Sequence, residues 1–401
     1  MSNGVTPPPE FGLALVPEID FAVKDPTIIQ NEVILSYQEA FLELTGIAKN
    51  LAPSDPVRLY LLVVCQWLSH QRVIIDFAGK QNLLQYATGD YLDNLGALYG
   101  ERGLRLPAAP AKTILRFTLP ILLAFDVVIL KGTQVQAPNS ILFETDDDAL
   151  ISAGDTTVDV GATAMTDGVA GNGFTPGQIS SLASWSQDFA VSVSNTTTSS
   201  GGADVETDDQ YRYRLWLAIE SFSTCGPHDA YEFWALSAHP KIIQCVVYSD
   251  PTIAGEVWLY PLLRDGEIPD DDMKALVLAS CSVETRRPLT DYVTVKSPVV
   301  VTYKLDMDYY VLKTNEVLLA TIVAAVEQAA DDWILWEKSA ISRDIICDEL
   351  RRRVLEAGAK RVVIHTPTPD FQVMAYNQLA VHDDTDPDNF PRVHFAGFED
   401  E

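Results

Sequence analysis

The chain has 401 residues, and its 28 Lys and Arg stand against 56 Asp and Glu, which gives a formal net charge of −28 at pH 7. Because nucleic acids and anionic lipids are bound mainly through Lys and Arg, this charge argues against nucleic-acid and membrane partners. Hydrophobic residues make up 47% of the chain, as is typical of globular proteins, so global disorder is excluded and the length predicts about two to four domains.

The first region, residues 1–110, is predicted to be a helical domain. Apolar residues recur at helical spacing over residues 31–44 and 57–78, and each of these segments is long enough for a stable helix. Two shorter helices are expected over residues 82–86 and 91–99 before prolines interrupt the pattern.

Residues 111–200 are predicted to form a β-rich domain. Apolar and polar residues alternate at its start, and glycines and prolines recur at short intervals, as they do between short strands. The most apolar stretch of the chain, residues 119–130, lies here. It is shorter than the roughly 20 residues of a membrane-spanning helix and contains Asp126, so we expect no membrane span.

Residues 201–297 are predicted to form an α+β domain. Thr207 and Gln210 have the spacing of a capping box, which predicts that a helix begins there. Strands are expected over residues 242–248 and 256–263, where apolar and β-branched residues are concentrated.

Residues 298–381 are predicted to form a second α+β domain, with one long strand over residues 298–312, a helix capped by Ser342, and further strands after it. Residues 382–401 are rich in Pro, Asp and Gly, and we expect an acidic extended tail. The predicted fold class is therefore α+β multidomain, with an N-terminal helical domain, a central β-rich domain and C-terminal α+β units.

No motif indicates a catalytic, cofactor-binding or metal-binding residue. The glycine-rich segment 168–173 is followed by Pro176 instead of the helix that a phosphate-binding loop requires. Asp384, Asp386 and Asp388 alternate as in a calcium loop, but the glycine and glutamate of that loop are missing. The histidines and cysteines lack metal-ligand spacing, and the scattered cysteines favour buried thiols in a reducing compartment. We therefore expect no enzyme activity, no cofactor and no metal.

Two polar segments are candidates for a hinge or an interaction. In the first, a double glycine predicts a flexible link, and acidic and basic residues follow it at the start of a helix. In the second, a basic turn lies in an otherwise acidic chain, and an interface role and a turn held by local hydrogen bonds are both open. The candidate residues are Gly201, Gly202, Asp204, Glu206, Arg212, Arg214, Arg287 and Asp291.

Several segments, taken in order, resemble the baseplate J-like family of contractile phage tails and related injection machines. The resemblance begins at Gln81 and continues through Ala87-Thr-Gly89, Leu92-Asp93 and Leu95-Gly96. The stretch most specific for the family is Gly201-Gly202-Ala203-Asp204 with Glu206, Asp208, Tyr211, Arg212 and Arg214. Residues 221–227 and Arg287-Pro288-Leu289-Thr290-Asp291 then follow in the family's order, so the resemblance covers roughly residues 80–300.

The resemblance implies a structural baseplate wedge subunit, located in the virion tail baseplate and assembled in the host cytoplasm. Such a subunit would help to form the ring around the central hub and spike, and would transmit the trigger for sheath contraction. The implied partners are the central hub and spike and copies of the chain itself, which would pair within each wedge and, through residues 298–381, between wedges. They also include a second wedge protein that bundles with the N-terminal helices, and a small sheath-initiating subunit.

Two other classes of function stay open from the sequence. One is a tail-associated cell-wall hydrolase, since 56 acidic residues supply many carboxylate pairs although no motif singles one out. The other is a host-glycan-binding module in residues 111–200, for which Trp185 and Phe189 are the aromatic candidates.

Overall fold

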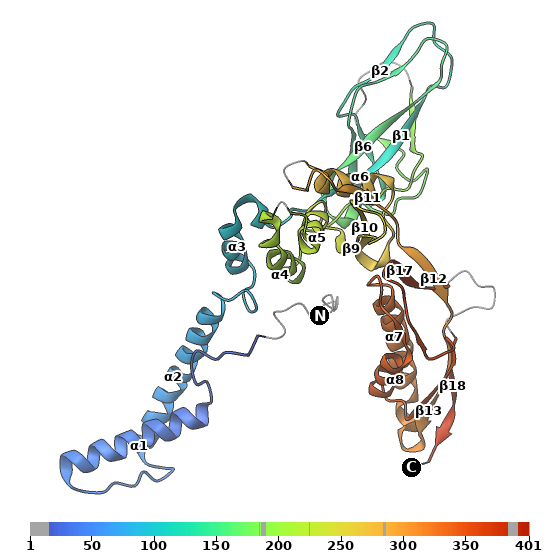
Figure 1. The fold of residues 1–401 in the computed structure, drawn as a ribbon. Helices are drawn as coiled ribbons and strands as arrows, with labels where there is room; N and C mark the ends of the chain where they lie inside the picture. Colours follow the sequence, from blue (N-terminus) through green and yellow to red (C-terminus); the bar gives the residue numbers. More distant parts are fainter. Residues whose placement is uncertain are drawn as a thin grey trace. The chain divides into compact units, whose positions relative to one another are not determined.

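The computed structural model describes residues 16–183, 185, 190–223, 225–283, 286–383 and 392–400. The chain divides between Leu104 and Arg105 into two compact units (Figure 1). The predicted fold class is confirmed, because helices come first, a β-rich domain follows, and α+β units complete the chain. Among the described residues, none of the helices combines the length and the apolar character that crossing a membrane requires.

The helical unit contains two long helices that begin in the same way. In each, an aspartate side chain accepts a hydrogen bond from a backbone N–H of the first turn, and a proline occupies the first helical position, where its missing N–H costs nothing. The capping residues are Asp25 and Asp55. The elements are α1 (Pro26–Thr45), α2 (Pro56–Lys80), α3 (Asp90–Gly96) and a 3₁₀ helix (Ala97–Gly103).

The helix expected over residues 82–86 is not formed, and these residues make turns instead. The physical reason lies at the end of α2. The side-chain oxygen of Gln81 accepts a hydrogen bond from the backbone N–H of Thr88 at 3.0 Å, which closes the intervening residues into a compact loop.

The β-rich domain is a six-stranded, nearly closed barrel-like sheet with strand order β7-β3-β4-β6-β1-β8. Along β1, buried and exposed residues alternate, so Leu115 and Phe117 enter the core while their neighbours face outward. The strands are β1 (Pro110–Thr118), β3 (Gln134–Gln136), β4 (Leu142–Thr145), β6 (Thr157–Asp167), β7 (Ser181–Leu182) and β8 (Ser192–Asn195). Short strands β2 (Val127–Ile129) and β5 (Ala149–Ile151) form a separate antiparallel pair.

The next α+β unit packs three helices with a three-stranded sheet of order β11-β10-β9. Both strand ranges expected here are confirmed, and the central strand β10 is buried along most of its length. The elements are α4 (Asp208–Leu217), α5 (His228–Leu236), β9 (Ile242–Tyr248), β10 (Glu256–Leu263), α6 (Asp271–Cys281) and β11 (Tyr292–Val295).

The second α+β unit places two helices against a sheet of order β15-β13-β18, and their apolar residues share one core. A parallel pair, β12 with β17, and a short antiparallel pair, β14 with β16, complete the unit. The strands are β12 (Val299–Tyr303), β13 (Asp306–Leu312), β14 (Ile345–Ile346), β15 (Arg361–Thr366), β16 (Phe371–Gln372), β17 (Gln378–His382) and β18 (Arg392–Glu399). The helices are α7 (Leu319–Glu337) and α8 (Cys347–Glu356).

Three expectations for this region are corrected. The single strand over residues 298–312 is two strands, because β12 pairs with β17 whereas β13 pairs with β15 and β18. Ser342 does not cap a helix: its φ is 64°, and α8 begins at Cys347. Residues 392–399, expected within an extended tail, form β18 in the sheet, where Val393 and Phe395 pack against the core. Residues 384–391, with the alternating aspartates, lie outside the described part of the chain.

The two α+β units contact each other through an aromatic cluster. The rings of Tyr248 and Tyr376 stack with their centroids 3.8 Å apart, and Tyr260 approaches Tyr376 edge-on. The side-chain oxygen of Gln244 also accepts a hydrogen bond from the backbone N–H of Ile341 at 2.8 Å. The contact therefore combines apolar burial with a directional hydrogen bond.

One carboxyl group in the second α+β unit is buried with few hydrogen bonds to offset the cost of removing it from water. Glu337 is fully buried; one of its oxygens accepts a hydrogen bond from the Ile346 N–H at 3.2 Å, and the other has no partner among the described residues. Burial raises the pKa of Glu337 to about 7, against the weaker opposing effect of Arg343 and Arg353.

This raised pKa predicts a pH-dependent stability. Between pH 4.5 and about 7 the folded state holds a proton on Glu337 that the unfolded state has lost, so this group stabilises at low pH and its contribution falls as the pH rises. Over this pH range the contribution of Glu337 to the free energy of unfolding falls by about 3 kcal/mol. Glu337→Gln should reduce this part of the pH dependence, measured by urea unfolding at pH 4.5 and 7.5. An equal change for the exposed Glu356→Gln control would contradict the assignment.

Candidate functional site

The double glycine lies where the chain leaves the barrel, and it is held closely there. The backbone N–H of Gly202 donates to the side-chain oxygen of Asn172 at 2.8 Å, and the Asn172 amide donates to the Gly202 carbonyl at 2.8 Å. Isolated β-bridges on either side join Lys112 to Ser200 and Ala109 to Ala203. The contacts of Gly202 therefore oppose the free rotation that a flexible link requires.

A different physical constraint requires glycine at each position of the pair. Gly201 has φ 85°, a left-handed conformation that proline, with φ fixed near about −65°, cannot adopt. A Cβ atom on Gly202 would lie 2.4 Å from the carbonyl oxygen of Gly168 and 2.8 Å from the Asn172 side-chain oxygen. Backbone conformation thus selects glycine at the first position, and close packing selects it at the second.

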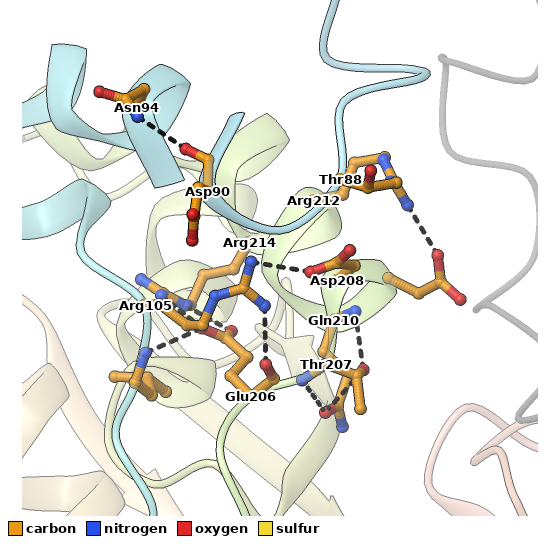
Figure 2. Close-up of polar contacts among 12 residues, drawn as sticks. Thr88, Asp90, Asn94, Arg105, Glu206, Thr207, Asp208, Gln210, Arg212 and Arg214 are labelled. Carbon is orange, nitrogen blue, oxygen red and sulfur yellow. Dashed lines mark hydrogen bonds and ion pairs between the residues drawn. The ribbon is translucent and has the colours of Figure 1, made fainter. Parts of the chain in front are cut away.

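A buried ion pair follows the double glycine. Arg214 on α4 donates from Nε and Nη2 to the two carboxylate oxygens of Glu206, at 2.8 and 2.6 Å (Figure 2). Both side chains are almost completely buried, so this bidentate pair has little competition from water. The helix that carries Arg214 begins with the predicted capping box, which the hydrogen bonds between Thr207 and Gln210 confirm.

The same carboxylate also binds the chain before the barrel. The backbone N–H of Leu106 donates to Glu206 Oε2 at 3.1 Å, and Arg105 donates from Nη1 to the Glu206 carbonyl at 2.9 Å (Figure 2). The guanidinium groups of Arg105 and Arg214 both lie over the buried ring of Tyr211, at 4.5 and 5.4 Å from its centroid. We call Arg105, Glu206, Tyr211 and Arg214 the linker network, since it joins the segments on both sides of the barrel.

Two further candidate residues, Asp204 and Arg212, lie outside the linker network. Asp204 accepts a hydrogen bond from the Val169 N–H at 3.1 Å, so it fixes a barrel turn. Arg212 pairs with the exposed Asp209 at 2.7 Å, on the surface of α4. Sequence reasoning therefore identified Glu206 and Arg214 but missed Arg105, whose bonded partner is 101 residues away in the chain.

The basic turn is held by local hydrogen bonds. Arg287 donates from Nε to the Ser282 carbonyl at 3.1 Å and from Nη1 to the Asp291 carbonyl at 2.6 Å. The Asp291 carboxylate accepts a hydrogen bond from Tyr231 on α5 at 2.6 Å. Burial and this hydrogen bond hold the pKa of Tyr231 well above its usual range, so the hydroxyl remains a donor. These contacts explain the turn, and an interface role for it stays a prediction.

The cysteines agree with the expectation of buried thiols, with one exception. Cys65, Cys245, Cys281 and Cys347 are buried and unpaired, while Cys225 is exposed. Burial raises the pKa of the Cys281 thiol to about 12, which keeps it protonated and unreactive.

The structure also brings together three side chains that sequence reasoning did not single out. His228, Asp229 and Glu232 meet at the start of α5, and each offers an atom of a type that binds metals. Their signal in the sequence is the spacing of His228 and Glu232, because residues four apart lie on the same face of a helix.

The linker network predicts a large loss of stability when one charge is removed. Arg214→Met leaves the Glu206 carboxylate buried without its main partner, so the free energy of unfolding should fall by about 3–5 kcal/mol. The control is Arg116→Met, which removes an exposed ion pair with Asp159 and should cost no more than about 1 kcal/mol. Urea unfolding of both variants gives the comparison, and equal costs would contradict the role of the network.

The close packing of Gly202 gives a second prediction. Gly202→Ala must displace the backbone at Gly168 or break the bonds to Asn172, so it should lower the free energy of unfolding by roughly 1–3 kcal/mol. In the control, Gly161→Ala on β6, the new Cβ meets only the Asp146 side-chain oxygen at 3.1 Å. Thermal unfolding distinguishes the two, and a freely tolerated Gly202→Ala would show that this segment is loosely held.

Two parts of the chain match the models of known families. Residues 114–202 match the family model of the Baseplate J-like protein barrel domain, and residues 223–297 match that of the Baseplate J-like central domain. Baseplate protein J of Escherichia phage P2 is 26% identical over 169 residues, which cover 42% of this chain and 55% of that protein. The chain thus spans about half the length of this curated relative.

The similarity to a solved structure is lower in sequence than the similarity to the P2 protein. A chain in the cryo-EM structure of the anti-feeding prophage (AFP) baseplate, 6-fold symmetrised, has 12% identity and a TM-score of 0.43. The superposition covers 94% of this chain and 99% of that one. Over residues 114–202 and 223–297, the chain is therefore similar to the barrel and central domains of the baseplate J-like family.

Proposed function

We propose that this chain is a structural wedge subunit of a contractile-tail baseplate, which contributes to the ring around the central hub and spike and transmits the trigger for sheath contraction. The family matches suggest a non-enzymatic, structural role. Such a protein acts by docking, so it needs surfaces that stay open in the isolated chain. The observation that carries the proposal is an apolar surface of this kind on α2.

Helix α2 exposes a row of large apolar side chains. Tyr60, Val63, Trp67 and Ile74 are spaced by three, four and seven residues, so they follow a heptad pattern along one face. They are between 44% and 67% exposed. We call these four residues the α2 seam.

The helical unit does not bury this surface by itself. Within α2 the buried residues are Cys65 and Asp76, and within α1 the buried residue is Ile29. Helices of this length normally gain most of their stability from packing an apolar face. The α2 seam therefore supports our proposal that these helices bundle with a second wedge protein.

The remaining contacts of the proposed ring would come from the other units. Residues 298–381 would pair copies of the chain between wedges, and a small sheath-initiating subunit and the central hub would contact the same assembly. A closed ring of such contacts has two packing arrangements, and the trigger would shift it from one to the other.

The α2 seam gives a direct test of docking. Trp67→Glu places a charge in the centre of the seam, and association with the wedge protein should weaken by at least about 30-fold, as for a central tryptophan in an interface. The measurement is native mass spectrometry of the full chain co-expressed with the neighbouring tail proteins.

The control carries the same charge on the same helix. Gln66→Glu lies off the seam and is exposed, so assembly should be retained, and circular dichroism should show both variants folded. If Trp67→Glu assembles as well as Gln66→Glu, the seam is not the docking surface.

The structure offers little support for a glycan-binding module. Trp185 packs against the barrel core, so its ring is not an open platform, and Phe189 lies outside the described residues. A glycan site or a hydrolase site would be revealed by binding or turnover in the isolated full chain, neither of which the docking proposal requires.

A further inference from the structure

Three metal-ligating side chains converge at the start of α5, away from the linker network. His228 and Asp229 are the first two residues of the helix, and Glu232 lies one turn further on. One ligand atom from each side chain lies within 4.8 Å of the others. His228 and Asp229 are exposed, whereas Glu232 is 8% exposed, so the cluster is open to solvent on one side and buried on the other.

Glu232 is a buried carboxylate with weak charge compensation. One of its oxygens accepts a hydrogen bond from the Tyr213 hydroxyl on α4 at 2.8 Å, and the basic group that acts on it is His228. The Asp229 carboxylate lies within 4.8 Å of the Glu232 carboxylate and adds a further negative charge. Because a buried carboxylate is costly without a counter-charge, a cation at this point would relieve both acids together.

We propose that His228, Asp229 and Glu232 bind a divalent transition-metal ion of the Zn²⁺ class. An imidazole nitrogen with two carboxylates is a donor set for Zn²⁺ and its neighbours, whereas Ca²⁺ and Mg²⁺ prefer oxygen ligands alone. With a neutral imidazole the two acids carry a charge of −2, which one such ion neutralises. Three protein ligands leave a fourth position for water.

Tyr213 gives this ion a structural consequence. Its hydroxyl donates to the Glu232 carboxylate from α4, so the ion, whose three ligands all lie on α5, would act on α4 through this hydrogen bond. Tyr213 would act as a positioning residue, since it orients a ligand and does not itself touch the metal. The proposed ion would therefore hold the first turn of α5 in place and, through Glu232, the Tyr213 side chain on α4.

A second histidine cluster supplies the internal control. On the sheet of the second α+β unit, the two oxygens of Asp308 lie 3.1 Å from His365 Nε2 and 3.1 Å from His394 Nδ1. As at the proposed site, where His228 Nδ1 lies 2.9 Å from an Asp229 oxygen, each histidine here is paired with a carboxylate oxygen, but this cluster contains no buried carboxylate. Any Zn²⁺ bound at this surface cluster would be removed by His365→Ala.

The test uses the purified full chain, freed of metal with a chelator and titrated with Zn²⁺ by calorimetry and with Co²⁺ by visible absorption. We expect one ion per chain, with binding lost in His228→Ala and in Glu232→Gln but retained in His365→Ala. Tyr213→Phe should weaken Zn²⁺ binding by about 10–100-fold, as expected for a residue that orients a ligand. The melting temperature should rise with Zn²⁺ only in chains that keep the site.

Two results would overturn the proposal. One is the absence of Zn²⁺ binding by the unaltered chain, and the other is binding that survives His228→Ala but is lost in His365→Ala. His228 is exposed, so its removal leaves the core intact and remains informative even where Glu232→Gln fails to fold.

Discussion

The buried ion pair between Glu206 and Arg214 is the interaction on which the arrangement of the barrel and the central domain depends. A single carboxylate receives the guanidinium of α4 and the backbone N–H of Leu106, so it joins the chain before the barrel, the chain after it and the first helix of the next domain. Because a buried charge tolerates few geometries, the pair restricts how these segments can meet. Tyr211 and Arg105 fill the space around it, which makes the junction well packed as well as well paired.

This junction bears on where movement would occur in the proposed assembly. A double glycine suggests flexibility, yet Gly202 is bonded on both its backbone groups and packed against Gly168. A rotation at this point would break those bonds and disturb the linker network. We therefore expect the barrel and the central domain to move together, so that rearrangement of a ring would occur at contacts between subunits. The proposed docking surface, the α2 seam, agrees with this expectation, because its side chains are exposed in the single chain.

Much of the local structure could be predicted from the sequence, and most of the long-range pairing could not. The capping box of Thr207 and Gln210 and the strands around Cys245 and Leu259 were predictable, since their signals lie within a few residues. The break between β12 and β13, and the pairing of β18 with β13, depend on partners far away in the chain, which periodicity does not reveal. Among the site residues, Glu206 and Arg214 could be identified as candidates, but their burial and the part played by Arg105 required the fold.

Under the proposed function, the exposed face of α2 has a consequence for the chain before it joins an assembly. Large apolar rows promote self-association, and in a crowded cell this chain would have to wait for its partner without aggregating. Its net charge of −28 supplies long-range repulsion between copies, which keeps them apart until a partner with a matching surface arrives. Mobile ions weaken that repulsion, so colloidal stability and orderly assembly are linked through the ionic strength of the surrounding medium.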